Sequence, residues 1–599
     1  MTIQSEQSSQ RKVIIVGGGP AGLTAGYDLT KYGIRPIVLE KLDRVGGISR
    51  TENYNGYFFD MGGHRFYTKS KEVNRFWQEI LGDEFLVRPR LSRIYYDHKF
   101  FDYPLKPLNA LAGLGVWQST LIVMSYLRWQ LFPYKEEDTF EEWVTNRFGK
   151  QLFSTFFKSY TEKVWGISTS ELKAEWAAQR IKNLSLKTAA INMLVKGNND
   201  VASLIEEFHY PRLGPGMLWG KVMDEIEGRG GQVKLNSNVV GINRNENRIE
   251  SVVVCCDGHE QTITGTDFIS SMPIPAFINS LNPPPPDHIV EAANKLKFRD
   301  FLTVCLIVDQ PKLFPDNWIY VHYPEVKVGR IQNFKNWSPD MVPDPTKTSL
   351  GLEYFCNKGD ELWNMPDDDL IELGKREVEL IDLANSEDIV DGCVFRVENT
   401  YPVYDSDYKD YLGTVREYLE SLENFQTIGR NGLHRYNNQD HAMLTGMLAV
   451  RNMVLGENND LWVVNAEQEY LEEIQEPELK PGVEEAVERA FAQAFMKLDA
   501  GAFGISMGSA VGLFLFAATF AVAISDWTGV ADKFWLLSQY FPGYGVNATG
   551  SILGFVYGFL VGFLFGWWFA FLRNASVLLY MSIIYRRAEL HVTRKILDF

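Results

Sequence analysis

The sequence predicts an α/β protein: a doubly wound domain with a helical insertion and an antiparallel β-sheet domain, followed by transmembrane α-helices. Three observations predict this fold class. Residues 13–40 read as a strand, a glycine turn, a helix and a second strand. Residues 230–256 alternate as paired strands do. Residues 500–525 and 552–572 carry no charge, and each run is long enough to cross a bilayer.

The glycine turn carries a dinucleotide-binding pattern in "VIIVGGGPAGLTAGYDLTKYGIRPIVLEK". Gly17, Gly19 and Gly22 occupy the three positions of GxGxxG. The first glycine permits the tight turn, the second lets a pyrophosphate approach, and the third lets helix and strand pack closely. Glu40 ends the second strand, where a carboxylate accepts hydrogen bonds from the adenosine ribose. This combination predicts a Rossmann-like nucleotide site.

A second glycine pair identifies the nucleotide. Gly46 and Gly47 follow the second strand in "DRVGGISRT". The pair resembles the extension found in flavoproteins of the amine oxidase and phytoene desaturase type. The resemblance implies that the cofactor is FAD and that both glycines contact it.

The composition limits the classes of molecule that the protein is expected to bind. A net charge of −17 argues against a nucleic-acid partner, because phosphate backbones require a basic surface. The five cysteines have no zinc-ligand spacing, so we expect no metal site and reduced thiols in the cytoplasm.

The C-terminal region predicts a hairpin of two membrane spans. Lys533 is the only basic residue between the spans, whereas the basic residues Arg573, Arg586 and Arg587 follow the second span. The positive-inside rule therefore places the large N-terminal region and the tail in the cytoplasm, at an inner or plasma membrane. Glycines recur every fourth residue in both spans, which predicts close packing either between the spans or with a second copy of the chain.

Three stretches, in order, resemble UDP-galactopyranose mutases. They are "GYFFDMGGHRFYT" (56–68), "TFEEWVTNRFGKQLFSTFFKSYTEKVWGI" (139–167) and "TIGRNGLHRYNNQD" (427–440). The resemblance covers roughly residues 12–455 and leaves out the membrane hairpin. It implies an enzyme of the amine oxidase and protoporphyrinogen oxidase superfamily that interconverts pyranose and furanose forms of a UDP-linked sugar with reduced FAD.

The resemblance assigns roles to residues at matching positions. His64 matches a histidine against the flavin, Arg430 an arginine near it, and Asp440 lies in the last FAD-contacting stretch. The positions implied to bind substrate are Tyr160, Trp165, Arg180, Arg330, Tyr401 and Tyr436. The positions implied to act in catalysis are His64, Arg180, Arg330, Tyr401 and Tyr436. Aromatic stripes on helices more often pack in a core, which is the alternative for Tyr160 and Trp165.

The implied mechanism needs no general-base carboxylate. Flavin reduced by NAD(P)H would attack the anomeric carbon through N5. The sugar ring of this adduct would then open and close again as the other ring form. Arg180 and Arg330 would grip the departing diphosphate, because guanidinium–phosphate pairing is strong and directional.

Two departures leave the substrate open. Asn438 replaces an acidic residue of the mutases, and residues 185–215 match their uridine-binding segment poorly. With a membrane hairpin, the sugar diphosphate could be nucleotide-linked or polyprenyl-linked, and the hairpin could instead hold the enzyme beside glycosyltransferases of cell-surface glycan synthesis. The competing class is a membrane-associated FAD oxidoreductase of the protoporphyrinogen oxidase, phytoene desaturase or amine oxidase type.

The predicted regions follow in chain order. They are a first FAD-binding segment (12–104), a mainly helical insertion (105–200), a β-rich substrate and FAD domain (201–420), a second FAD-binding segment (421–455), an acidic linker (456–499), the transmembrane hairpin (500–572) and a basic cytoplasmic tail (573–599).

Overall fold

The computed structural model describes residues 11–103, 105, 107–174, 207–465, 498–525 and 528–597. Two units divide the chain, residues 1–474 and 475–599. Arg180, the rest of the predicted helical insertion to residue 200, and residues 466–497 of the predicted acidic linker lie outside the described residues. The mixed α/β fold that the sequence predicts is confirmed in the first unit.

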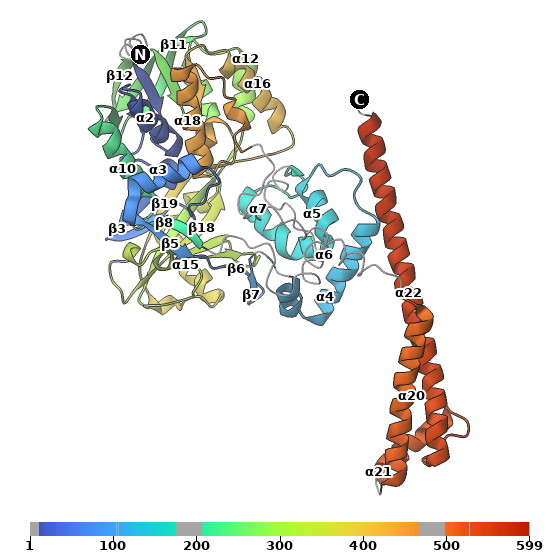
Figure 1. Cartoon of the computed structure of the whole chain (residues 1–599). Helices are drawn as coiled ribbons and strands as arrows, with labels where there is room; N and C mark the ends of the chain where they lie inside the picture. The colour runs from blue at the N-terminus through green and yellow to red at the C-terminus, as the bar shows by residue number, and fades with distance from the viewer. Residues whose placement is uncertain are drawn as a thin grey trace. The chain divides into compact units, whose positions relative to one another are not determined.

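A five-stranded parallel sheet gathers strands from distant regions of the chain (Figure 1). Its order is β20 (Phe425–Thr427), β13 (Asp267–Ser270), β1 (Val13–Val16), β2 (Ile37–Leu39) and β9 (Gln232–Lys234). Helices α2 (Pro20–Lys31), α10 (Pro215–Gly228) and α18 (Gln439–Leu455) pack beside it. A β-carbon on Gly446 would lie 2.4 Å from the Ala21 carbonyl oxygen, so α18 lies directly against α2. Because β1, β13 and β20 run parallel, the carboxyl ends of β1 and β20 lie at the same edge of the sheet.

A seven-stranded sheet forms the second layer. Its order is β19 (Ile389–Pro402), β15 (Phe298–Val308), β18 (Thr348–Cys356), β17 (Arg330–Asn333), β16 (Trp318–Val321), β6 (Ser92–Tyr96) and β7 (Lys99–Asp102). Every pairing is antiparallel except that of β16 with β6. Every residue of β18 is buried, because α13 (Phe334–Trp337) and α14 (Glu361–Asn364) also pack on it.

Smaller elements complete the first unit. A four-stranded sheet has the order β12 (His259–Thr264), β11 (Arg248–Cys256), β10 (Asn238–Asn245) and β14 (Leu281–Asn282). Two ribbons pair β3 (Thr51–Tyr54) with β4 (Tyr57–Asp60) and β5 (Phe85–Pro89) with β8 (Glu207–Pro211). The further helices are α3 (Lys71–Leu81), α11 (Ile274–Asn279), α12 (Asp287–Lys295), α15 (Asp367–Leu380), α16 (Tyr408–Glu420) and α17 (Gly429–Gly432).

A helical region lies between β7 and β8 in the chain. It contains α4 (Pro107–Leu131), α5 (Phe140–Phe148), α6 (Lys150–Leu152), a π-helical turn η3 (Phe153–Lys158) and α7 (Ser159–Trp165). Thr139 and Glu142 form a capping box that starts α5. Gly166, at φ +66°, ends α7 directly after Trp165 and so fixes where that indole lies.

The second unit holds α20 (Ala500–Ile524), α21 (Thr528–Trp535) and α22 (Ala548–Leu597). Ala500–Ile524 and Ala548–Ala575 are long and apolar enough to cross a membrane. Figure 1 shows α20 beside the N-terminal half of α22. Exposed residues of the two helices are mostly large and apolar, including Leu513, Phe514, Leu564, Phe565 and Trp568. By length and composition the pair could span a bilayer.

The glycine faces of the two helices pack on each other. A β-carbon on Gly562 would lie 3.0 Å from Gly508 Cα, and one on Gly558 would lie 3.0 Å from Gly512 Cα. This settles the alternative that the spacing left open: the glycine groove is filled within the hairpin. The prediction that these glycines join two copies of the chain therefore has no support in the described hairpin.

Replacing Gly562 by leucine is expected to splay the hairpin. Its β-carbon would come within 2.8 Å of the Met507 carbonyl oxygen, where no side chain fits. Ala510→Leu is the matched control, because Ala510 is exposed on the same pair of helices. Hydrogen–deuterium exchange of α20 in detergent should rise in Gly562→Leu and stay unchanged in the control. Equal exchange in both variants would contradict the packing.

Candidate active site

The glycine turn after β1 is packed too tightly for any side chain. Gly17 has φ +104° and donates its N–H to the Leu39 carbonyl oxygen at 2.8 Å. A β-carbon on Gly17 would lie 2.2 Å from Ser271 Oγ, and one on Gly22 would lie 2.0 Å from the Gly17 carbonyl oxygen. Two glycines of the motif are thus required by the turn itself. The start of α2 faces the cavity described below with free N–H groups and the positive end of its dipole.

Glu40 orders the loop beside this turn. Its buried carboxylate accepts hydrogen bonds from the N–H groups of Gly18 at 2.7 Å and Leu42 at 3.0 Å. Each oxygen keeps a second lone pair, so the carboxylate can still accept from a ribose hydroxyl.

The second glycine pair packs on the first. Gly46 donates its N–H to the Gly18 carbonyl oxygen at 2.8 Å, and a β-carbon on Gly47 would lie 3.2 Å from Gly19 Cα. Gly46 and Gly47 both have positive φ, at +107° and +56°. The two loops therefore form one backbone cradle at the carboxyl end of β1.

A cavity of about 910 Å³ extends from this cradle to the seven-stranded sheet. Its lining includes most of the predicted site residues, namely Gly17, Gly19, Glu40, Gly47, His64, Arg330, Tyr401, Arg430, Tyr436 and Asp440. The glycine approach, the ribose-facing carboxylate and the size of the cavity fit a flavin dinucleotide. Asp440, in the first turn of α18, and Gly429 lie in the same wall.

His64 lies where the glycine cradle meets the seven-stranded sheet. Its Nε2–H donates to the Met61 carbonyl oxygen at 2.8 Å, which leaves Nδ1 as an acceptor. Burial lowers the pKa of His64 to about 4 against the opposing effect of that bond, and the charges of Arg430 and Arg330 add to the lowering. At neutral pH His64 is therefore an uncharged imidazole. A β-carbon on Gly62 would lie 3.5 Å from His64 Nε2 and 3.8 Å from Arg330 Nη2, so the two side chains converge there.

Arg330 is held by a carboxylate that sequence reasoning missed. Its Nε and Nη2 donate to the two oxygens of Glu353 at 2.9 and 2.5 Å, and Gln332 donates to Glu353 Oε1 at 2.9 Å. Glu353 is fully buried in β18. Burial alone would lower the pKa of Arg330, but the charge of Glu353 raises it well above its ordinary value. Three of the five guanidinium N–H groups remain for another acceptor.

Tyrosines and a second arginine form the facing wall. Tyr401 stacks on Tyr436 at 5.4 Å, and the Arg430 guanidinium lies 4.6 Å from the Tyr436 ring. Arg430 also donates to the carbonyl oxygens of Asn437 at 2.8 Å and Thr400 at 3.0 Å. No described carboxylate forms a salt bridge with Arg430. Its charge is therefore compensated by backbone dipoles and aromatic faces.

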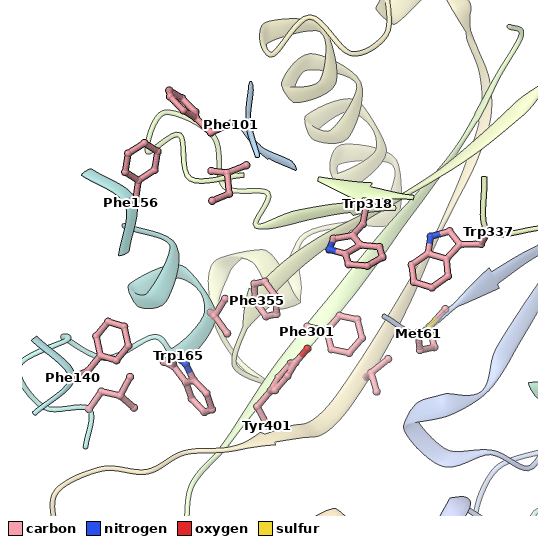
Figure 2. Close-up of a cluster of buried hydrophobic side chains, with 14 of the residues drawn as sticks. Met61, Phe101, Phe140, Phe156, Trp165, Phe301, Trp318, Trp337, Phe355 and Tyr401 are labelled. Carbon is pink, nitrogen blue, oxygen red and sulfur yellow. The ribbon is translucent and has the colours of Figure 1, made fainter. Parts of the chain in front are cut away.

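Trp165 and Tyr160 stand behind this wall. Trp165 is buried in a hydrophobic cluster with Tyr401 and Phe355 (Figure 2), with its ring 6.2 Å from that of Tyr401. Tyr160 stacks on His322 at 4.6 Å, and burial raises its pKa well above the usual value. Neither residue belongs to the cavity lining. Both pack against its wall, and Trp165 has the core environment typical of a helical aromatic stripe.

The cavity lining holds six basic side chains and three acidic ones. The basic residues are Lys41, Arg50, Arg65, Arg330, Arg396 and Arg430, and the acidic residues are Glu40, Glu398 and Asp440. Arg50, Arg330 and Arg396 form salt bridges with carboxylates outside the lining, those of Glu52, Glu353 and Asp367, so the site as a whole has no large excess of positive charge.

One signal in the sequence could have identified Glu353. In the segment "TSLGLEYFC" this residue is the only charged one, and a charge inside a buried strand requires a partner. Trp318 and Trp337, which also line the cavity and stack at 5.2 Å, carry no comparable signal.

His434 predicts a pH-dependent stability. Burial lowers its pKa to about 4, with Asp405 acting in the opposite direction. The unfolded chain therefore binds this proton first as pH falls, and stability is lost on acidification. From pH 7 to 5 the loss is about 2 kcal/mol for this group. The free energy of unfolding of His434→Asn should fall less with acidification than that of the wild-type protein.

Asp60 also contributes to the pH dependence of stability, with the opposite sign, because burial raises its pKa to about 7. Asp60 is present in both proteins, so comparing His434→Asn with the wild-type protein isolates the contribution of His434. His98→Asn is a matched control for the substitution, because both histidines have positive φ and His98 is exposed. An unchanged slope in His434→Asn would contradict a buried neutral His434.

The comparisons with known proteins agree with this geometry. A family model described as flavin containing amine oxidoreductase matches residues 20–435. A probable UDP-galactopyranose mutase from Klebsiella pneumoniae is 27% identical over 183 residues, which cover 28% of this chain and 44% of that protein. A 15-cis-phytoene desaturase from Capsicum annuum is 23% identical over 295 residues, 44% of this chain and 47% of that protein. The chain spans less than half the length of either relative in these matches.

Solved structures show the same fold. The crystal structure of a reduced UDP-galactopyranose mutase matches with a TM-score of 0.66 at 20% identity, over 77% of this chain and 98% of the other. A putative protoporphyrinogen oxidase from Exiguobacterium sp. matches with a TM-score of 0.58 at 17% identity, over 75% and 99%. At these identities the likeness is one of fold.

Proposed function

We propose that this chain, which belongs to the flavin-containing amine oxidoreductase family and is therefore an FAD-dependent enzyme, is a sugar mutase. The substrate is a sugar diphosphate, nucleotide-linked or polyprenyl-linked, whose pyranose and furanose forms the enzyme interconverts without net oxidation. NAD(P)H serves as the reductant, and the product enters cell-surface glycan synthesis. The hairpin anchors the enzyme in the inner or plasma membrane with its catalytic unit in the cytoplasm, beside glycosyltransferases that use the product.

One observation carries this proposal. Arg330 and Arg430 line the same cavity as the dinucleotide cradle, together with the stacked pair Tyr401 and Tyr436. Two partly buried guanidinium groups are costly to desolvate further, and an apolar substrate would leave their remaining donors without acceptors. A diphosphate accepts from several donors at once and stabilises both cations. The site therefore suits a sugar diphosphate better than a carotenoid or a porphyrinogen.

Each residue has a role in this proposal. The glycine cradle and Glu40 would hold FAD, which in its reduced form would supply the nucleophile for the anomeric carbon. Arg330, fixed in plane by Glu353, donates to the diphosphate as it leaves and holds it for recapture. Arg180, outside the described residues, is proposed as the second diphosphate ligand.

The aromatic residues exclude water from the substrate site. Burial raises the pKa of Tyr401, so its hydroxyl can donate to a phosphate oxygen at neutral pH. Tyr436 stacks on it and donates beside it. Tyr160 and Trp165 shape the sugar pocket from behind, and neutral His64 offers Nδ1 as an acceptor beside the flavin.

The test compares two carriers with the full-length enzyme. Dithionite-reduced protein is incubated with UDP-galactopyranose and, separately, with a polyprenyl-diphosphate galactopyranose. We expect the furanose form of one of them, identified by nuclear magnetic resonance, and no product from the oxidised enzyme. No ring-contracted product from either carrier would refute the mutase proposal.

The second candidate is a membrane-associated FAD oxidoreductase. The family description and the phytoene desaturase match favour it. In that case substitution of Arg330 would leave turnover nearly unchanged, because an apolar substrate makes no use of its charge.

A further inference from the structure

Helix α4 has an apolar stripe on its solvent-exposed face. After a break at Gly115, its large apolar residues recur every three or four positions. The members of this stripe are Trp117, Leu121, Met124, Leu127, Leu131 and, just past the helix end, Phe132. Trp117 is 75% exposed, Met124 62% and Phe132 73%. Side chains three and four apart lie on one face of a helix, so the stripe is continuous over about 22 Å.

The opposite face of α4 is firmly packed. Ile122 is 2% exposed, and Ser125 Oγ accepts from the Gln151 N–H at 3.1 Å. Gln130 donates to the Asn146 carbonyl oxygen at 2.9 Å. Contacts with α5 and α6 thus fix the rotation of the helix and hold the stripe outward. A contiguous apolar patch of this kind on a soluble surface marks an interaction site.

The rest of the chain favours lipid as the occupant of this stripe. Residues 466–497 connect the first unit to α20, and a chain extends at most ~3.3–3.6 Å per residue, so the first unit stays within roughly 110 Å of the bilayer. Arg128 is the only charged residue between Trp117 and Phe132, so this part of the helix offers little for a contact based on charge pairing. Trp129 and Tyr134, 4.6 Å apart, lie at the end of the helix, and such amphipathic rings favour the membrane interface.

We propose that α4 lies in the membrane interface with its stripe among the lipid chains, as a second membrane contact besides the hairpin. The proposal rests on the hairpin spanning the bilayer and is independent of the reaction. Insertion follows from burial of apolar area rather than from attraction to anionic headgroups, so neutral phosphatidylcholine suffices and added salt leaves it unchanged.

The test uses the full-length protein in phosphatidylcholine vesicles. A nitroxide is attached at Met124→Cys in a protein whose partly exposed cysteines, Cys255, Cys256 and Cys393, are replaced by serine. Cys305 and Cys356 are kept, because they are buried. We expect the label to collide with oxygen several-fold more often than with a water-soluble nickel chelate. Leu380→Cys, on an exposed position of α15, is the matched control and should show the reverse.

Two results would overturn the proposal. One is nickel accessibility at Met124→Cys equal to that of the control. The other is spin–spin broadening that disappears on dilution with unlabelled protein, which would assign the stripe to a second copy of the chain. Introducing Leu127→Glu into the labelled protein should lower oxygen accessibility several-fold while flavin absorbance shows that the fold is kept.

Discussion

Arg330→Ala is expected to lower the rate of ring interconversion by about 10²–10³-fold, the usual effect of removing a donor that stabilises developing charge. The same change leaves the fully buried carboxylate of Glu353 without its cation, which costs about 3–5 kcal/mol of stability. Activity and the free energy of unfolding should therefore both fall. The rate is measured from product formation by the reduced enzyme at saturating substrate, and the free energy of unfolding is measured by denaturant titration.

The double variant Arg330→Met/Glu353→Gln separates chemistry from folding. It removes both charges while keeping similar volumes, so stability should recover most of the loss. Activity should stay low, because the diphosphate no longer receives hydrogen bonds from the guanidinium of Arg330. Recovery of activity together with stability would show that Arg330 serves the fold alone.

Gly22→Ala is expected to abolish FAD binding. Its β-carbon would lie 2.0 Å from the Gly17 carbonyl oxygen, so α2 and the glycine turn must separate. The phosphates then lose the amide groups at the helix start. The purified variant should lack flavin absorbance and melt at a lower temperature than the wild-type protein.

Gly220→Ala is the matched control for this prediction. Gly220 also lies in a helix of the first unit, and a β-carbon there meets nothing within 4 Å. It should bind FAD normally and gain slightly in stability from the better helix propensity of alanine. Full flavin content in Gly22→Ala would contradict the packing of the turn.

The local portion of the nucleotide site could be predicted from the sequence. Gly17, Gly22 and Glu40 lie within one βαβ segment, where spacing along the chain determines spacing in the fold. The two long apolar helices that could span a membrane could be predicted equally well, because each depends only on its own composition.

The remainder depends on long-range pairings that no local pattern encodes. Arg330 meets Glu353 because β17 pairs with β18 in a particular register. Tyr401 meets Tyr436 because β19 and the loop before α18 end at the same cavity. The outward stripe of α4 was also missed, since apolar periodicity predicts a buried face and here some of it is exposed.

Isomerisation and oxidation of the sugar can be told apart by following the sugar and the flavin in one sample. Fully reduced enzyme is mixed anaerobically with the active sugar diphosphate while absorbance at the flavin band and product mass are recorded. We expect a product of unchanged mass with a five-membered ring and a flavin that remains reduced over many turnovers. A product that differs by two hydrogens, formed in step with a change in flavin redox state, would refute the mutase proposal and identify an oxidoreductase.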